Sequence, residues 1–296
     1  MSDFGKFVDA FTPAEVAEKV KTVGVDKANM PLLPLVVLSL MAGAFISFAA
    51  MYYTVVMTDA NLPYGLSRLI GGLVFALGFI LVVVAGAELF TGNTLVVMAY
   101  GKREITFLGL MRNWGIVYTG NAIGALVTVY LVFLSGYLGN AEYGVGVTAL
   151  KTGLAKVELT TTEAFVRGLF CNVLVCLGSW MVYASRSVTD KVMAVLFPIS
   201  GFVAMGFEHS IANMYMIPIA MVAAADQAIV AASQLDAAQL QALDFSGLLG
   251  NLLPVTLGNI VGGVGFVAMA YYLVYVYSGP GHTKHHETNR SENSPE

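Results

Sequence analysis

A short polar pattern occurs twice inside long apolar stretches, and it restricts what this chain can fold into. Residues 86–93 read GAELFTGN and residues 206–213 read GFEHSIAN, so both follow G-x-E-x-x-x-x-N. Acids, His, Thr and Asn are costly in a hydrocarbon environment. They fit there only if the helix breaks and its irregular backbone lines a cavity enclosed by protein. The pattern therefore predicts two interrupted membrane helices that form the two halves of one transport site.

The composition is that of a membrane protein. Apolar residues make up 57% of the chain and charged residues 11%, whereas soluble domains carry about 25% charged residues. Six apolar runs reach the roughly 20 residues needed to cross a bilayer. They lie at residues 31–57, 66–100, 107–138, 165–183, 192–225 and 248–277, with the two breaks inside the second and fifth. The sequence thus predicts an all-α membrane protein with six transmembrane helices.

A second pattern, N-x6-G-N-x-x-G, begins at Asn113 and again at Asn251. Both patterns therefore recur three spans later, and an odd number of spans turns the second copy upside down in the membrane. This predicts an inverted three-plus-three repeat, about residues 31–138 and 165–277, with the broken helices together near the middle of the membrane. The small residues of the second pattern are interpreted as helix-packing contacts.

Basic residues lie mostly on one side of the predicted spans. That side holds Lys6, Lys19, Lys21, Lys27, Lys102, Arg103, Arg186, Lys191, Lys284 and Arg290, and the opposite loops hold Lys151 and Lys156. The positive-inside rule then places both termini in the cytoplasm. Residues 1–30 are predicted to be a cytoplasmic amphipathic segment, either a helix on the membrane surface or a plug over a pore. Residues 31–278 are the predicted channel domain, and residues 279–296 a disordered tail.

His209 and Thr91 lie in opposite breaks and are the main candidates for contact with a solute. An imidazole has an ordinary pKa of about 6.5, so it can donate a hydrogen bond or a proton to an anion. The Thr91 hydroxyl can hold the imidazole or the solute. Asn172, a lone amide in the fourth span, either meets the solute or bridges helices.

The acids of the two breaks, Glu88 and Glu208, would repel anions if they faced a pore. We interpret them as structural groups that cap the half-helices by accepting hydrogen bonds from free backbone N–H groups. Asn93 and Asn213 are given the same structural role. Aromatic rings flank the breaks and either pack or form a dry gate, and they belong to Phe75, Phe79, Phe90 and Phe202. Lys151 and Lys156 are either solvated loop charges or a positive field that concentrates anions.

An intramembrane enzyme is disfavoured. The sequence contains no H-E-x-x-H motif, and no Ser/His/Asp set lies within the spans. Cys171 and Cys176 are interpreted as packing residues, and the tail histidines, His282, His285 and His286, as solvated. We therefore expect no metal, cofactor or nucleic-acid partner. A pore for neutral solutes is a further alternative, which the two Asn residues suit but His209 does not.

Residues 87–91, 172–177 and 206–214 resemble the formate/nitrite transporter family, and the likeness extends over residues 1–278. The resemblance implies an aquaporin-like protomer, a homopentamer with one pore per subunit, and passage of small monovalent anions, chiefly formate, across the bacterial cytoplasmic membrane. It implies that Thr91 and His209 form the central pair. The other implied pore residues are Leu89, Phe90, Asn172 and Val175, with Phe75 and Phe202 at constrictions and Lys156 in the periplasmic vestibule.

Two features of the sequence depart from the formate members of this family. Phe79 stands where a leucine is expected, so the inner gate would have a different shape. Gly92 and Asn93 are closer to the nitrite members, whose break carries Gly-His, so a nitrite or hydrosulfide channel stays open. The sequence also leaves open a passive or proton-coupled mechanism and a cytoplasmic partner for the N-terminal segment.

Overall fold

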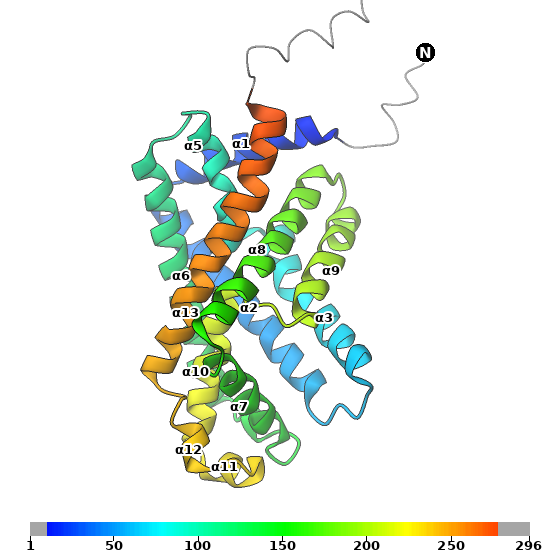
Figure 1. Ribbon diagram of the computed structural model, residues 1–296, viewed down its shortest axis with the longest axis vertical. Helices are drawn as coiled ribbons and strands as arrows, with labels where there is room; N and C mark the ends of the chain where they lie inside the picture. The colour runs from blue at the N-terminus through cyan, green and yellow to red at the C-terminus, as the bar shows by residue number, and fades with distance from the viewer. Residues whose placement is uncertain (1–10, 278–296) are drawn as a thin grey trace, which may run out of the picture.

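The computed structural model describes residues 11–277, and the elements in that range are all helices (Figure 1). The first half of the chain contains α1 (Pro13–Ala28), α2 (Leu32–Met57), α3 (Tyr64–Leu81), η2 (Val82–Gly86), α4 (Phe90–Asn93), η3 (Thr94–Val96), α5 (Val97–Gly101), α6 (Phe107–Leu134) and η4 (Tyr137–Gly139). The second half contains α7 (Gly144–Val157), α8 (Thr161–Ala184), α9 (Val188–Ala204), α10 (Ser210–Ala224), α11 (Gln227–Ser233), α12 (Ala237–Leu240), α13 (Phe245–Ile260), η5 (Val261–Met269) and η6 (Tyr272–Val276).

The predicted class, an all-α membrane protein, is confirmed. Within residues 11–277, five helices are long and apolar enough to cross a membrane, or up to six if the bent pair of α10 and α11 is one span. The predicted fifth run is divided between α9 and α10, of 17 and 15 residues. Each of these is shorter than the roughly 20 residues that a complete crossing needs. α1 lies across one end of the molecule, and α11 and α12 lie at the other (Figure 1).

Both predicted helix breaks are present. Gly86 and Gly206 have positive φ values of 82° and 73°, a backbone conformation that glycine adopts without a steric penalty. The chain is extended after each glycine, and new helices start at Phe90 and Ser210. The two copies of the first sequence pattern therefore form the same kind of interruption.

The glycines of the second pattern allow close helix packing. A Cβ atom added to Gly124 of α6 would collide with the Leu40 carbonyl of α2, and one added to Gly262 would collide with the Leu169 carbonyl of α8. Small residues at such contacts let two helix backbones approach closely.

Replacing Gly262 by Ala is expected to lower the free energy of unfolding by about 1–3 kcal/mol, because the added methyl group meets backbone that cannot move aside. Gly265→Ala is the matched control, since a Cβ atom at Gly265 meets open space. The control should be neutral or slightly stabilising. Thermal unfolding of the purified variants in detergent measures both effects, and equal stabilities would contradict the packing role.

Two helices, α1 and α7, pack in ways that the sequence did not predict. The apolar face of α1 is buried against protein, with Val16 and Val20 packed among Leu95, Met98 and Trp180. This helix is therefore docked on the protein through its apolar face, and its position relative to the membrane stays a prediction. α7 occupies the stretch predicted as a polar loop and packs against α10. The predicted tail and the apolar positions before residue 11 lie outside the described residues.

Candidate functional site

Thr91 and His209 meet where the two breaks face each other. Thr91 lies in α4, and His209 is the residue before α10. Thr91 Oγ1 lies 3.0 Å from His209 Nε2, although 118 positions separate the two residues in the sequence. Both side chains are buried, with exposed fractions of 0% and 3%. The structure thus brings together the two residues that the sequence placed in one passage.

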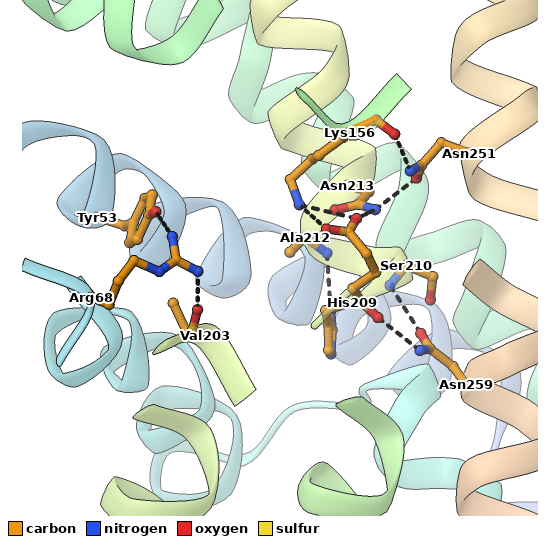
Figure 2. A network of polar contacts seen from close by, with 11 residues as sticks. Tyr53, Arg68, Lys156, Val203, His209, Ser210, Ala212, Asn213, Asn251 and Asn259 are labelled. Atoms are coloured by element: carbon orange, nitrogen blue, oxygen red, sulfur yellow. Dashed lines mark hydrogen bonds and ion pairs between the residues drawn. The ribbon is translucent and has the colours of Figure 1, made fainter. Parts of the chain in front are cut away.

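The hydrogen bonds of His209 fix which ring nitrogen carries the proton. Nδ1 accepts a hydrogen bond of 3.1 Å from the backbone N–H of Ala212 (Figure 2). A ring nitrogen that accepts in this way is unprotonated, so in neutral imidazole the hydrogen is on Nε2. Nε2–H then donates to the Thr91 hydroxyl. The Thr91 hydroxyl can then donate its own hydrogen to another acceptor. The site therefore suits solutes with lone pairs, such as anions.

One asparagine secures the backbone of each break. Asn121 of α6 accepts a hydrogen bond from Phe90 N–H (3.0 Å) and donates to the carbonyls of Ser39 (2.8 Å) and Glu88 (2.9 Å). Because the first N–H groups of a helix have no partner within it, this amide stabilises the start of α4 while tying it to α2.

Asn259 repeats this arrangement at the second break. It accepts from Ser210 N–H (2.9 Å) (Figure 2). It also donates to the carbonyls of Gly168 (2.7 Å) and Glu208 (3.0 Å). Sequence reasoning assigned the small residues of the second pattern to helix packing, gave its asparagines no role and so missed this one. The available signal was that an amide occupies the same place in both copies.

The two acids differ from their predicted role as backbone caps. Glu88 accepts hydrogen bonds from Lys27 Nζ (2.6 Å) and Asn93 Nδ2 (2.7 Å). Glu208 accepts from Lys156 Nζ (3.0 and 3.1 Å) and Asn213 Nδ2 (2.6 Å). The prediction is therefore wrong on the partners, which are ammonium and amide side chains. Because each carboxylate is neutralised by a lysine, neither presents a bare negative charge to a passing anion.

A second asparagine completes each of these clusters. Asn93 also donates to Asn113 Oδ1 (3.0 Å), and Asn113 donates to the Lys27 carbonyl (3.0 Å). On the other side, Asn213 donates to Asn251 Oδ1 (2.7 Å), and Asn251 donates to the Lys156 carbonyl (2.8 Å) (Figure 2). We call these two sets, each a lysine, an acid and two asparagines, the first and second polar clusters. Lys27, on α1, was not among the predicted site residues.

A cavity of about 480 Å³ leads to His209 from the side of α7. Its lining includes one acid and four cations, namely Glu208, Arg68, Lys151, Lys156 and Arg167. A second cavity, of about 520 Å³, opens near α1 and is lined by Lys19, Lys27, Glu88, Arg186 and Lys191, among others. Excess positive charge in a cleft concentrates anions. Both cavities therefore favour anionic over cationic solutes.

The apolar residues predicted to line the pore are buried. Leu89, Phe79 and Val175 have exposed fractions of 3% or less and belong to one hydrophobic cluster with Phe75 and Phe202. On the α7 side, the Phe75 and Phe202 rings pack edge to face with centroids 6.0 Å apart. The Phe202 ring stacks on the His209 ring at 5.9 Å. Of the two rings predicted at a constriction, Phe202 therefore lies beside the imidazole and Phe75 packs on Phe202.

Two other predicted pore residues make packing or bridging contacts with the helices. The Phe90 ring packs against Tyr118 (4.9 Å between centroids) and Trp114 (6.1 Å) of α6. Asn172 bridges helices, because its Nδ2 donates to the carbonyls of Thr91 (3.2 Å) and Asn259 (2.6 Å). Its Oδ1 is buried and has no hydrogen-bond partner within residues 11–277.

Two interrupted helices, a polar pair in an apolar constriction and a charged cavity on either side define a membrane channel or transporter. The model of the formate/nitrite transporter family matches residues 14–273. The chain therefore belongs to the formate/nitrite transporter family, which confirms the resemblance seen in the sequence. Its relatives are channels and transporters, so this protein is not an enzyme.

Similar proteins match over nearly the whole chain. "Formate channel FocA" of Escherichia coli (strain K12) is 40% identical over 280 residues, which are 93% of this chain and 98% of that protein. "Formate channel FocA" of Haemophilus influenzae is 40% identical over 86% of this chain and 91% of its own. A solved structure, "Pentameric formate channel with formate bound", matches with a TM-score of 0.78 at 41% identity, covering 83% of this chain and 98% of that one.

Proposed function

We propose that this protein is a homopentameric channel that conducts small monovalent anions, chiefly formate, across the bacterial cytoplasmic membrane. The observation that carries the proposal is the buried Thr91–His209 pair, which offers a hydroxyl donor at the centre of an otherwise apolar constriction. The names of the relatives, formate channels at 40% identity over 93% of the chain, support formate as the solute. The solved pentameric relative supports five subunits.

The proposed orientation places α1 and both termini in the cytoplasm and the α7 cavity outside. The charge distribution supports it, since the α1 cavity is lined by Lys19, Lys27, Arg186 and Lys191 and basic loops stay in the cytoplasm. We also propose the inverted repeat. The matching hydrogen bonds of the two polar clusters support it. In this repeat α1, which carries Lys27, corresponds to α7, which carries Lys156. The proposed domains remain residues 1–30, 31–278 and 279–296.

An anion would enter the outer cavity, lose its water at the Phe75–Phe202 constriction and accept a hydrogen bond from Thr91. Removing an anion from water without compensation is expensive, so one hydroxyl donor lowers the barrier only in part. Transfer of a proton from His209 would let formate cross as the neutral acid. His209 must first hold a proton on both nitrogens, so its Nδ1 bond from Ala212 has to break. Proton-coupled uptake thus requires a local rearrangement of this ring.

Flux through purified protein in liposomes tests the proposal. Formate should enter proteoliposomes faster than protein-free liposomes, and the same rate in both would refute a formate channel. Nitrite, which the family name keeps open, and hydrosulfide are tested at equal concentration as alternative substrates. If either anion crosses faster than formate, that anion is the principal solute.

The N-terminal segment remains a proposed plug and a proposed contact for a cytoplasmic partner. Removing residues 1–28 would also delete Lys27 of the first polar cluster, so it cannot test a plug cleanly. Removing residues 1–10 keeps the Thr12 cap and the contacts of α1. If the segment covers the pore, this shorter deletion should raise formate flux at low pH. Unchanged flux in proteoliposomes would exclude residues 1–10 as the part of the segment that covers the pore.

A further inference from the structure

Arg68 of α3 joins three chain segments beside the outer constriction. Its Nη2 donates to the Val203 carbonyl and its Nη1 to the Tyr53 hydroxyl (3.0 Å) (Figure 2). Its Nε donates to the Ala204 carbonyl (3.0 Å). Figure 2 shows the guanidinium between Tyr53 and Val203. The residue is half-buried and lines the α7-side cavity.

These bonds hold the end of α9 at the point where the second break begins. The last carbonyls of a helix lack partners within it and carry partial negative charge, so a cation there is stabilising. A planar guanidinium offers several donors in a fixed geometry, which a lysine cannot reproduce. A Cβ atom at Gly206 would lie only 3.5 Å from Nη2. Arg68 therefore fixes α9 directly beside the left-handed glycine of the break.

The same residues build the constriction. Phe202 immediately precedes Val203, and its ring packs between Phe75 and His209. The ring of Tyr53, whose hydroxyl accepts from Arg68, packs edge to face on Phe75 with centroids 6.4 Å apart. Arg68 thus closes a ring of contacts that runs through Tyr53, Phe75 and Phe202. A substitution at Arg68 would therefore alter the spacing of the two phenylalanine rings, through Tyr53 on the Phe75 side and through Val203 on the Phe202 side.

We propose that Arg68 is a positioning residue that fixes the separation of Phe75 and Phe202 and thereby limits the size of the carboxylate that passes. The inference rests on the proposed formate flux and deepens it from substrate class to size selection. It differs from a role as one more cation of the cavity, because a cation alone would attract formate and larger carboxylates alike.

The test compares acetate with formate flux in proteoliposomes of purified pentamer. Arg68→Lys keeps the charge but loses the fork of hydrogen bonds, and Tyr53→Phe removes a single hydroxyl while keeping the ring on Phe75. In a fitted apolar site, one extra carbon group is discriminated by about 10-fold or more. We therefore expect the acetate-to-formate flux ratio to rise by roughly threefold or more in Arg68→Lys, and by less in Tyr53→Phe.

Lys151→Met is the matched control, because it removes a cation from the same cavity without touching the constriction. It should lower both fluxes and leave their ratio unchanged. An unchanged ratio in both Arg68→Lys and Tyr53→Phe would overturn the inference, as would an equal rise in Lys151→Met. Failure of the unchanged protein to carry formate would instead refute the proposed function, so the two failures are distinguishable.

Discussion

Replacing His209 by Asn is expected to abolish the pH dependence of formate uptake while the protein stays folded. Asn is a good residue before a helix, so its Oδ1 can accept the Ala212 N–H bond that His209 Nδ1 accepts now. An amide does not bind a proton in the physiological range, whereas an imidazole does. A positioned proton donor contributes about 10²–10⁴-fold, so uptake in acid should fall about 10²-fold in this variant.

Initial rates of formate uptake into proteoliposomes, between about pH 5 and pH 8, measure this effect. The matched control is Thr91→Val, which removes the hydroxyl beside Nε2 but keeps the titratable ring. Its flux should be lower at every pH and should still rise in acid. A wild-type pH profile in the His209→Asn protein would refute proton transfer through this residue and leave a passive pore.

Lys156→Met is expected to cost about 3–5 kcal/mol in the free energy of unfolding. The substitution leaves the Glu208 carboxylate, whose side chain is 6% exposed, without its ammonium partner. An uncompensated buried charge is far more costly than the missing pair itself. Lys27→Met should have a similar effect, because the side chain of Glu88 is 7% exposed.

The double variant Lys156→Met/Glu208→Gln separates structure from electrostatics. It removes both charges and should recover most of the lost stability, as judged by thermal unfolding in detergent. If the Lys156 ammonium also attracts anions, formate flux in this double variant should be lower than in the unchanged protein, although its stability has recovered. Equal stability of the single and double variants would contradict the ion pair, and a surface control such as Lys151→Met should change stability by less than about 0.5 kcal/mol.

The sequence predicted the parts of the site that are unusual for a membrane helix. A histidine and a threonine inside apolar runs have few explanations, so His209 and Thr91 could be paired before any coordinates. Lys27 could not be recognised, because it was one of several basic residues near the cytoplasm and its partner is 61 positions away. The Phe90 ring direction depends on where α4 starts, which the sequence pattern leaves undetermined.

α7 and Arg68 illustrate two other limits of the sequence. α7 has only 14 residues and carries two lysines, so it reads as a polar loop, and only its contact with α10 explains why it is helical. Arg68 lies near the end of an apolar run, where a basic residue usually faces water. Its hydrogen bonds go to the carbonyls of residues that are 135 and 136 positions away. A local sequence pattern cannot predict partners at that distance.

The two polar clusters have a consequence for how the protein is made. Lys27, Glu88, Asn93 and Asn113 all precede the midpoint of the chain, and their four counterparts all follow it. As the polypeptide leaves the ribosome, the first half can therefore satisfy its own costly groups before the second half exists. Contact between Thr91 and His209 is left to the final docking of the two halves, so this buried pair is completed only once both have been inserted.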